Sequence, residues 1–496
     1  MQLPSYIPPL TLLFSILPSL VSTHAIPKPS SNPSSLLINT TTGPIQGFIN
    51  TTAPNVRQWL GIPYASPPTL DLRFAAPRPV KPWTSTLDTT TFAPSCMQQF
   101  SSGKTVYTEE VPQFLINGGV SEDCLYINVW APGTPTEESL PVIVYVPGGG
   151  FSSGGANSVY KIPDQLIQRT QSVVFVIMNY RVNVFGFPNA KGLDDINLGL
   201  LDQRMVVEWT RDNIAAFGGD PSRITLWGQS AGGASTSMYS YAWRSDPIVS
   251  GLIADSGAAG LSVGEIDKAQ TNFTSLASVV GCKGLSDAAT LTCMRNVPAG
   301  TLENALSTSE GLDFGPTPDG MVVFGNYTKR AAEGLVADVP MIMGNNANEG
   351  AGFVPFTPDG PGDEALDEAS LGIECSVATG VSDRMLSNST TYRYEYFGNF
   401  SNVSPVSWMG AYHSSELPLV FGTHPLYRGN STAFEWSVSE TMQGLWLSFA
   451  ADPSKPPSVP SFSWPAYEAG EATLAEFARH NTTVQAGSGT LDASLC

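Results

Sequence analysis

Along the first two-thirds of the chain, short runs of apolar residues alternate with segments in which apolar residues recur at the spacing of a helix. Between two of these runs, residues 197–216 carry apolar side chains at the spacing of a helix and end near a glycine pair. Strands separated by helices favour an α/β fold with a mostly parallel central sheet and helices on both faces. In such a sheet, functional groups gather beyond the carboxyl ends of the strands. The predicted strands are residues 141–146, 173–179, 224–227 and 339–343.

Composition and charge narrow the class of protein. The chain has 496 residues, of which 42% are hydrophobic and 14% charged, and one large α/β domain can reach this length. We expect residues 26–496 to form a single domain. The formal net charge of −19 disfavours binding to nucleic-acid phosphates and to anionic membranes. No segment after the N-terminus is long and apolar enough for stable membrane insertion.

The N-terminus has the pattern of an export signal. Residues 10–21 are mostly apolar, and Thr23-His24-Ala25 fits a small-x-small cleavage site, so we predict a signal peptide over residues 1–25. Residues 26–40 are rich in Ser and Pro, and we expect an exposed leader there. Six cysteines and nine Asn-x-Ser/Thr sequons agree with a secreted, extracellular glycoprotein. The sequons are at Asn39, Asn50, Asn272, Asn326, Asn388, Asn399, Asn402, Asn430 and Asn481.

A serine bounded by glycines follows the third predicted strand. Residues 228–232 are Gly-Gln-Ser-Ala-Gly, with Ser230 at their centre. This turn between strand and helix is so tight that side chains on either side of the serine would clash, and its strain holds the hydroxyl clear of the backbone. The helix that follows favours negative charge at its N-terminus. We predict that Ser230 is the nucleophile of an α/β-hydrolase fold.

A serine hydroxyl needs a base at neutral pH, and the chain has four histidines. One of them, His24, lies in the predicted signal peptide. The other three all satisfy the chain order of α/β-hydrolases, in which the serine precedes the acid and the acid precedes the histidine. His424 lies in a polar loop and His480 in a charged stretch, whereas His413 enters an apolar segment. We therefore predict His413 as the base.

The acid of the triad must fix the tautomer of the imidazole. Many carboxylates lie between the serine and the histidine. Glu349 follows the strand 339–343 and a polar turn, which puts it at the carboxyl end of a strand. On the residues alone, Asp319 and Asp359 remain alternatives.

A glycine triplet after the first predicted strand provides candidate oxyanion donors. Glycine lets backbone N–H groups approach a substrate oxygen closely. We predict an oxyanion hole made by the N–H groups of Gly149, Gly150 and Ala231. The chain has no C-x-x-C pair, no H-E-x-x-H motif and no dinucleotide-binding glycine pattern, so we expect neither a metal site nor a cofactor.

Several longer motifs resemble those of the type-B carboxylesterase and lipase family, which includes cholinesterases and fungal lipases. The resemblance covers almost all of the mature chain. It implies an α/β-hydrolase fold and ester hydrolysis, it favours Glu349 as the acid, and it implies that Ser256 is a buried serine supporting the triad. The matching segments are residues 121–129, 202–203, 212–221, 348–350 and 413–416.

The same resemblance implies a pairing of the six cysteines, for which sequence alone permits 15 arrangements. The implied pairs are Cys96–Cys124, Cys282–Cys293 and Cys375–Cys496. The first closes a loop of the kind that overlies the active site in this family. The apolar residues of that loop either cover an acyl pocket or pack beneath the loop; they are Val106, Tyr107, Val111, Phe114, Leu115 and Ile116.

These residues predict a secreted serine hydrolase that cleaves carboxylic esters through an acyl-enzyme, with a small-molecule or lipid ester as its partner. One alternative is a triacylglycerol lipase, in which the Cys96–Cys124 loop is a lid. Another is a non-catalytic adhesion module of the same fold. Such modules typically lack the nucleophile, so the complete set of catalytic positions favours the enzyme.

Overall fold

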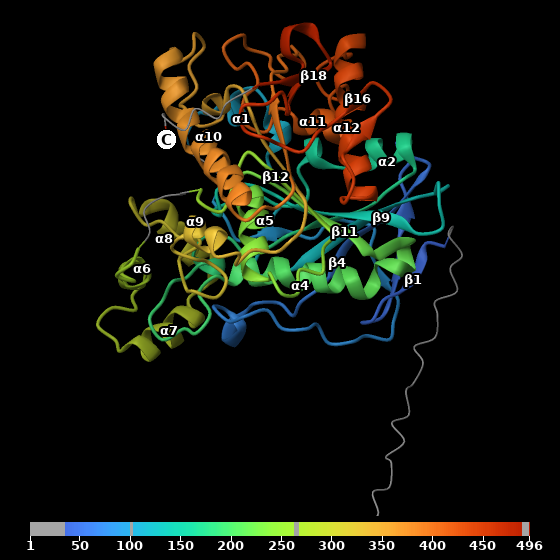
Figure 1. Cartoon of the computed structure of the whole chain (residues 1–496). Coiled ribbons are helices and arrows are strands. Elements are labelled where there is room, and N and C mark those ends of the chain that lie inside the picture. Colours follow the sequence, from blue (N-terminus) through green and yellow to red (C-terminus); the bar gives the residue numbers. More distant parts are fainter. Residues whose placement is uncertain (1–34, 100–102, 262–266, 489–495) are drawn as a thin grey trace, which may run out of the picture. The chain divides into compact units, whose positions relative to one another are not determined.

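A mostly parallel β-sheet runs through the part of the chain that the structure describes (Figure 1). The structure is a computed structural model that describes residues 35–99, 103–261, 267–488 and 496. The predicted signal peptide lies outside these residues. Among them, the largest sheet has the strand order β18 (Val484–Gly487), β17 (Leu474–Phe477), β14 (Thr391–Tyr396), β13 (Met341–Asn346), β12 (Gly251–Asp255), β11 (Gly219–Gln229), β9 (Leu140–Val146), β10 (Val174–Met178), β8 (Tyr126–Pro132), β4 (Val56–Pro63) and β3 (Phe48–Ile49).

The middle of this sheet is parallel and its margins are antiparallel. All neighbours from β10 to β17 pair in parallel, whereas β8, β4 and β3 at one margin and β18 at the other pair antiparallel. The carboxyl ends of the parallel strands therefore meet at one edge. This agrees with the predicted α/β fold.

Helices cover both faces of the sheet because apolar side chains alternate along its strands. In β9, Val142 and Val144 pack with α4 (Leu198–Asn213) and α5 (Ala231–Ala242). Ile143 and Tyr145 of the same strand join the core of the opposite face. Figure 1 shows the two groups of helices on opposite sides of the strands. The helices of the second face are α2 (Asp164–Thr170), α11 (Leu417–Phe421) and α12 (Ala433–Ala451).

The predicted strands are all present, with shifted ends. The strand predicted over 224–227 is β11, which begins five residues earlier, because Gly219 pairs with Leu140 before a register shift. The residues at this register shift are mostly polar, so the pattern of apolar positions does not predict this part of the strand. The helix predicted over 197–216 is α4, which continues as a 3₁₀ turn, η4 (Ile214–Phe217).

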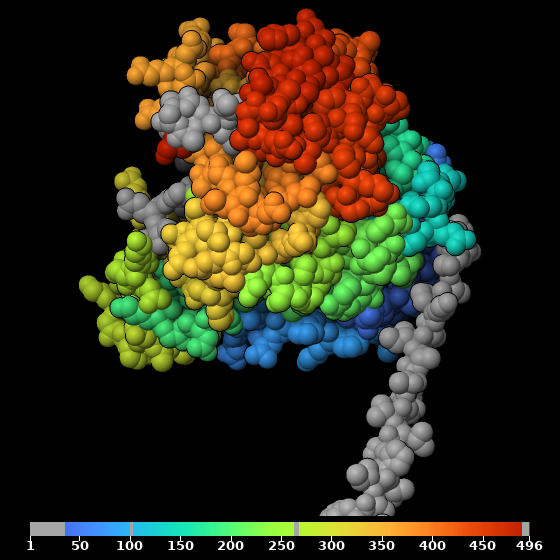
Figure 2. Space-filling view, viewed as in Figure 1, coloured from blue at the N-terminus to red at the C-terminus, as the bar shows by residue number. Residues whose placement is uncertain are grey.

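We predicted an exposed leader over residues 26–40, and this is wrong for the last residues of that segment. β1 (Leu37–Asn39) pairs antiparallel with β2 (Pro44–Gln46), and Ile38 is buried in the core. Residues 31–496 form one compact unit by their internal contacts. In the space-filling view, the yellow-to-red surface of its last third adjoins the green surface of its middle third (Figure 2).

Three disulfides have the pairing that the family resemblance implies: Cys96–Cys124, Cys282–Cys293 and Cys375–Cys496. Cys282–Cys293 belongs to a separate, smaller hydrophobic core, which the pattern of apolar positions did not predict. This core is formed by α6 (Asn272–Val279), α7 (Asp287–Asn296), α8 (Ala299–Thr308) and the residues beneath them. None of the helices in the described ranges has the length and apolar character needed to cross a bilayer.

One predicted glycosylation site conflicts with the fold. Asn402 is 5% exposed, and its amide nitrogen donates to the His424 carbonyl at 3.0 Å and to the Ser431 hydroxyl at 2.9 Å. A glycan would replace one amide hydrogen and needs open space, so we no longer expect one on Asn402. The side chains of the other eight sequon asparagines are exposed or half-buried, and their glycosylation stays a prediction.

Candidate active site

Ser230 lies at a strained turn between β11 and α5. Its φ of 60° and ψ of −125° are unfavourable for a residue with a side chain, and such strain persists only where the surroundings enforce it. The Ser230 N–H donates to the Asp255 carbonyl at 2.8 Å. A Cβ at Gly228 or Gly232 would overlap a backbone carbonyl oxygen. The two glycines are therefore required by close backbone approach, as the motif predicted.

His413 and Glu349 form a buried pair. The His413 Nδ1 lies 2.5 Å from Glu349 Oε2. The other carboxylate oxygen, Oε1, accepts from the Ser256 hydroxyl at 2.6 Å and from the Asn346 N–H at 2.7 Å. Because a carboxylate accepts hydrogen bonds, Nδ1 carries the proton and Nε2 keeps a lone pair that can accept one. This is the tautomer that can act as a base.

Sheet topology brings these residues together from distant parts of the sequence. Ser230 follows β11, Ser256 follows β12 and Glu349 lies just beyond β13, and these three strands are parallel neighbours. His413 arrives by a loop rather than by a strand. A β-bridge between Asn348 and Tyr412 holds that loop beside the acid.

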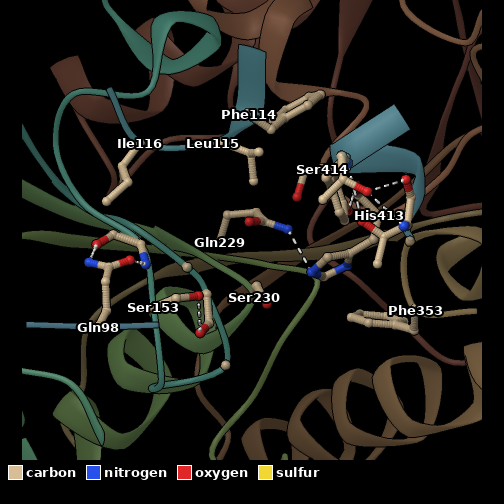
Figure 3. Close-up of a pocket in the computed structure, with 18 of the residues that line it drawn as sticks. Gln98, Phe114, Leu115, Ile116, Ser153, Gln229, Ser230, Phe353, His413 and Ser414 are labelled. Atoms are coloured by element: carbon tan, nitrogen blue, oxygen red, sulfur yellow. Dashed lines mark hydrogen bonds between the residues drawn. The ribbon is translucent and has the colours of Figure 1, made fainter. Parts of the chain in front are cut away.

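The side chain of Gln229 contacts His413, and both residues line the cavity. Its amide nitrogen is 3.1 Å from His413 Nε2 and donates to it, as Figure 3 shows. Ser230 is 8% exposed and lines the same cavity, but no hydrogen bond of the described residues joins its hydroxyl to His413. Catalytic hydrogen bonds often tighten only when substrate binds. While Gln229 donates to Nε2, that nitrogen is not open to the Ser230 hydroxyl.

Of the three predicted oxyanion donors, Gly149 and Gly150 line this cavity, and Ala231 directly follows Ser230, which also lines it. Gly149 and Gly150 follow β9, and among the described residues no backbone hydrogen bond uses their N–H groups. Ala231 is the first residue of α5, where an N–H has no acceptor within its helix. Gly149 has a φ of 133°, and a Cβ there would overlap the Ser153 carbonyl. The loop thus depends on glycine at this position.

The cavity has a volume of about 310 Å³ and a largely apolar wall. Much of the wall comes from the loop closed by Cys96–Cys124. Tyr107, Phe114, Leu115 and Ile116 of that loop line the cavity. Val106 and Val111 instead pack in the core beneath it. Some apolar residues of this loop therefore line the cavity and others pack beneath the loop, and Phe114 does both.

Two further carboxyl groups are buried and interact with the charge of Glu349. Burial, aided by the charge of Glu349, raises the pKa of Asp255 to about 7. Burial, with the charges of Asp255 and Glu349, raises the pKa of Glu416 well above its usual range. Asp255 Oδ2 accepts from the Trp227 indole at 2.5 Å, whereas Oδ1 has no partner among the described residues. A proton on either group lowers the number of negative charges beside Glu349.

We expect Asp255→Asn to stabilise the fold increasingly as pH rises. The folded-state pKa of Asp255 lies above the unfolded value of about 3.9. Between about pH 4 and pH 7 the unfolded chain therefore ionises Asp255 more readily than the native protein does, and the free energy of unfolding falls as pH rises. Asparagine keeps an acceptor for Trp227 and does not ionise. Urea unfolding of both proteins should show a stability difference that grows by up to roughly 4 kcal/mol over this range. A difference independent of pH would contradict the buried ionisation.

The other candidate residues lie away from this hydrogen-bonded group. His424 is buried and pairs with Glu435 at 3.1 Å and with Ser431 at 2.6 Å. Asp319 accepts from the N–H groups of residues 321–323, which is a structural role. His480 and Asp359 are exposed. In the described ranges, no three His, Cys, Asp or Glu side chains cluster so that they could hold a metal ion.

Three residues of the site were not predicted from the sequence as parts of its chemistry. The Tyr107 hydroxyl donates to the His413 carbonyl at 2.6 Å, so the covering loop is tied to the loop of the base. Gln229 contacts the imidazole, and Lys161 lines the cavity. Gln229 could have been identified from the sequence, because it directly precedes Ser230. No pattern of residues identified Lys161.

Comparison with known proteins gives matches over nearly the whole chain. The model of the carboxylesterase family matches residues 34–372 and 364–493. A chlorogenic acid esterase of Aspergillus niger is 52% identical, over 97% of this chain and 99% of its own. A secreted lipase 5 of Gibberella zeae is 39% identical, over 92% of each chain. A para-nitrobenzyl esterase of Bacillus subtilis is 32% identical, over 87% of this chain and 92% of its own.

Proposed function

Because the chain belongs to the carboxylesterase family, and is thus a carboxylic ester hydrolase, we propose that it cleaves esters through an acyl-enzyme on Ser230. One observation carries this proposal. The hydrogen-bonded series Ser256–Glu349–His413 ends at a histidine that lines the same cavity as Ser230. A base with a fixed tautomer beside a strained serine is the arrangement that nucleophilic catalysis needs.

In the proposed reaction, His413 Nε2 accepts the proton of Ser230 as the hydroxyl oxygen attacks the ester carbonyl. The same imidazole then protonates the leaving alcohol and later activates the water that releases the acid. Glu349 stabilises the imidazolium, and Ser256 and the Asn346 N–H hold its carboxylate in place. Gly149, Gly150 and Ala231 donate their N–H groups to the oxyanion, and each donor contributes about 3 kcal/mol of transition-state stabilisation.

Export of the protein is part of the same proposal. The predicted signal peptide, three disulfides and the similarity to a secreted lipase support an extracellular enzyme. A mature chain that begins near Ile26 is the expected product. N-terminal sequencing of protein from the culture medium checks both points, and intact protein inside the cell would contradict them.

A lipase is the second candidate. The apolar residues of the Cys96–Cys124 loop over the cavity, and the likeness to the secreted lipase 5, favour it. A lipase should gain activity when a triacylglycerol exceeds its solubility limit, whereas an esterase should not. The name of the Aspergillus relative makes chlorogenic acid the first soluble ester to test.

A fluorophosphonate label tests the proposed nucleophile. Such reagents phosphonylate an activated serine, so we expect one label per chain, recovered on the peptide that contains Ser230. Labelling should be abolished in Ser230→Ala and slowed in His413→Ala. Ser152 and Ser153, which lie near the glycine triplet, are the internal controls in the peptide map. A label on another serine, or none on an enzyme that cleaves esters, would refute the assignment.

A further inference from the structure

The cavity contains a buried lysine whose charge has no partner among the described residues. Lys161 is 8% exposed and lines the same cavity as Ser230 and His413. Within the described ranges, no hydrogen bond or ion pair engages its ammonium group, although thirteen ion pairs form elsewhere. A buried charge is costly unless it is paired. A lysine without an internal partner that faces a cavity therefore points to a ligand with a negative charge.

The surroundings of Lys161 leave this charge uncompensated. None of the described residues that line the cavity is Asp or Glu, although the whole chain has a net charge of −19. The charge of Glu416 acts on the pKa of Lys161, but burial raises the pKa of Glu416 itself well above its usual range. Burial lowers the pKa of Lys161 to about 8, which leaves the group mostly cationic at neutral pH. The cavity is thus a local positive site in an acidic protein.

Lys161 is held in place from two sides. It ends the 3₁₀ helix η3 (Val159–Lys161). Just before this helix, the Ser158 hydroxyl donates to the Phe114 carbonyl at 2.8 Å. From the other side, the Thr423 hydroxyl donates to the Tyr160 carbonyl at 2.8 Å. The lysine therefore lies on a fixed turn between the loop that covers the cavity and the segment that follows His413.

We propose that Lys161 binds a carboxylate carried by the alcohol portion of the ester substrate. The proposal rests on the proposed function, in which His413 protonates the leaving alcohol, so the alcohol must lie on the histidine's side of the cavity. The turn of Lys161 packs against α11, directly after the histidine loop. An ammonium group there suits an anionic alcohol, and a neutral ester leaves it unpaired. The enzyme then prefers esters of hydroxy acids over esters of simple alcohols.

Matched substrates test this preference. Chlorogenic acid carries a carboxylate on its alcohol portion, and its primary carboxamide and methyl caffeate have the same acyl group without that charge. We expect the wild-type kcat/KM for chlorogenate to exceed that for the carboxamide by at least about tenfold. Lys161→Met should lower the ratio of kcat/KM for chlorogenate over methyl caffeate by about 10- to 100-fold. Lys161→Arg, which keeps the charge, should recover part of that ratio.

A second measurement separates this proposal from the proposed function. Quinate, the alcohol released from chlorogenate, should inhibit wild-type cleavage of 4-nitrophenyl acetate more strongly than quinamide does. Lys161→Met should remove that difference. An unchanged substrate ratio, or equal inhibition of wild type by quinate and quinamide, would overturn the role of Lys161 while ester cleavage persists. Failure of the acyl-enzyme would instead appear as full activity in Ser230→Ala.

Discussion

Ser230→Ala should lower kcat for any ester by about a millionfold, which is the scale of removing the nucleophile from a serine triad. In the proposed reaction Ser230 forms the covalent intermediate, so without it His413 and Glu349 have no hydroxyl to activate. The variant should fold normally, because Ser230 is held through its backbone, with its N–H on the Asp255 carbonyl. Steady-state cleavage of 4-nitrophenyl acetate measures the loss. Substrate affinity should change little.

His413→Ala and the double variant complete this test. Residues that act as one unit are strongly non-additive, so the double variant should be no slower than Ser230→Ala alone. The residual rate comes from binding and from the oxyanion donors. A His413→Ala variant with near wild-type kcat would mean that another group accepts the proton. His424→Ala is the matched control, since that histidine is also buried beside a glutamate but lies outside the cavity.

The parts of this site that could be predicted from sequence are those with a local pattern. Gly228 to Gly232 specify the elbow, because close backbone approach excludes side chains at both glycines. The ends of β9 and β13 could be placed from their apolar runs, which put the glycine triplet and Glu349 at one edge of a sheet. The acid still needed the family resemblance. Its place after a strand and a polar turn favoured Glu349, but the residues alone left Asp319 and Asp359 as alternatives.

The features that could not be predicted depend on contacts between distant segments. The turn that carries Lys161 is anchored to distant segments, since Ser158 bonds to Phe114, 44 positions earlier, and Tyr160 bonds to Thr423, 263 positions later. The β1 strand was hidden in a Ser/Pro-rich stretch, since its pairing with β2 buries only Ile38. A strand of three residues is too short to show a pattern of alternating apolar and polar positions that would distinguish it from a leader.

Glu349→Gln should lower kcat by about 10⁴-fold, even though the two side chains have nearly the same shape. The reason lies in the hydrogen bonds around the carboxylate. Oε1 accepts from both Ser256 and the Asn346 N–H, so only the carbonyl oxygen of a glutamine fits that position. The glutamine amide nitrogen then faces His413 Nδ1 and donates to it. This moves the imidazole proton to Nε2, where it blocks the transfer from the serine.

The same hydrogen bonds suggest a control variant and a second substitution that should restore part of the lost kcat. Glu435→Gln alters the other buried histidine–glutamate pair, so it should leave kcat within about twofold once the fraction folded is measured. Adding Ser256→Ala to Glu349→Gln removes one donor that fixes the amide, which then has less reason to point its nitrogen at the imidazole. We expect the double variant to recover part of the lost kcat. If Glu349→Gln alone retained wild-type kcat, the carboxylate would not control the tautomer, and its hydrogen bonds would be only structural.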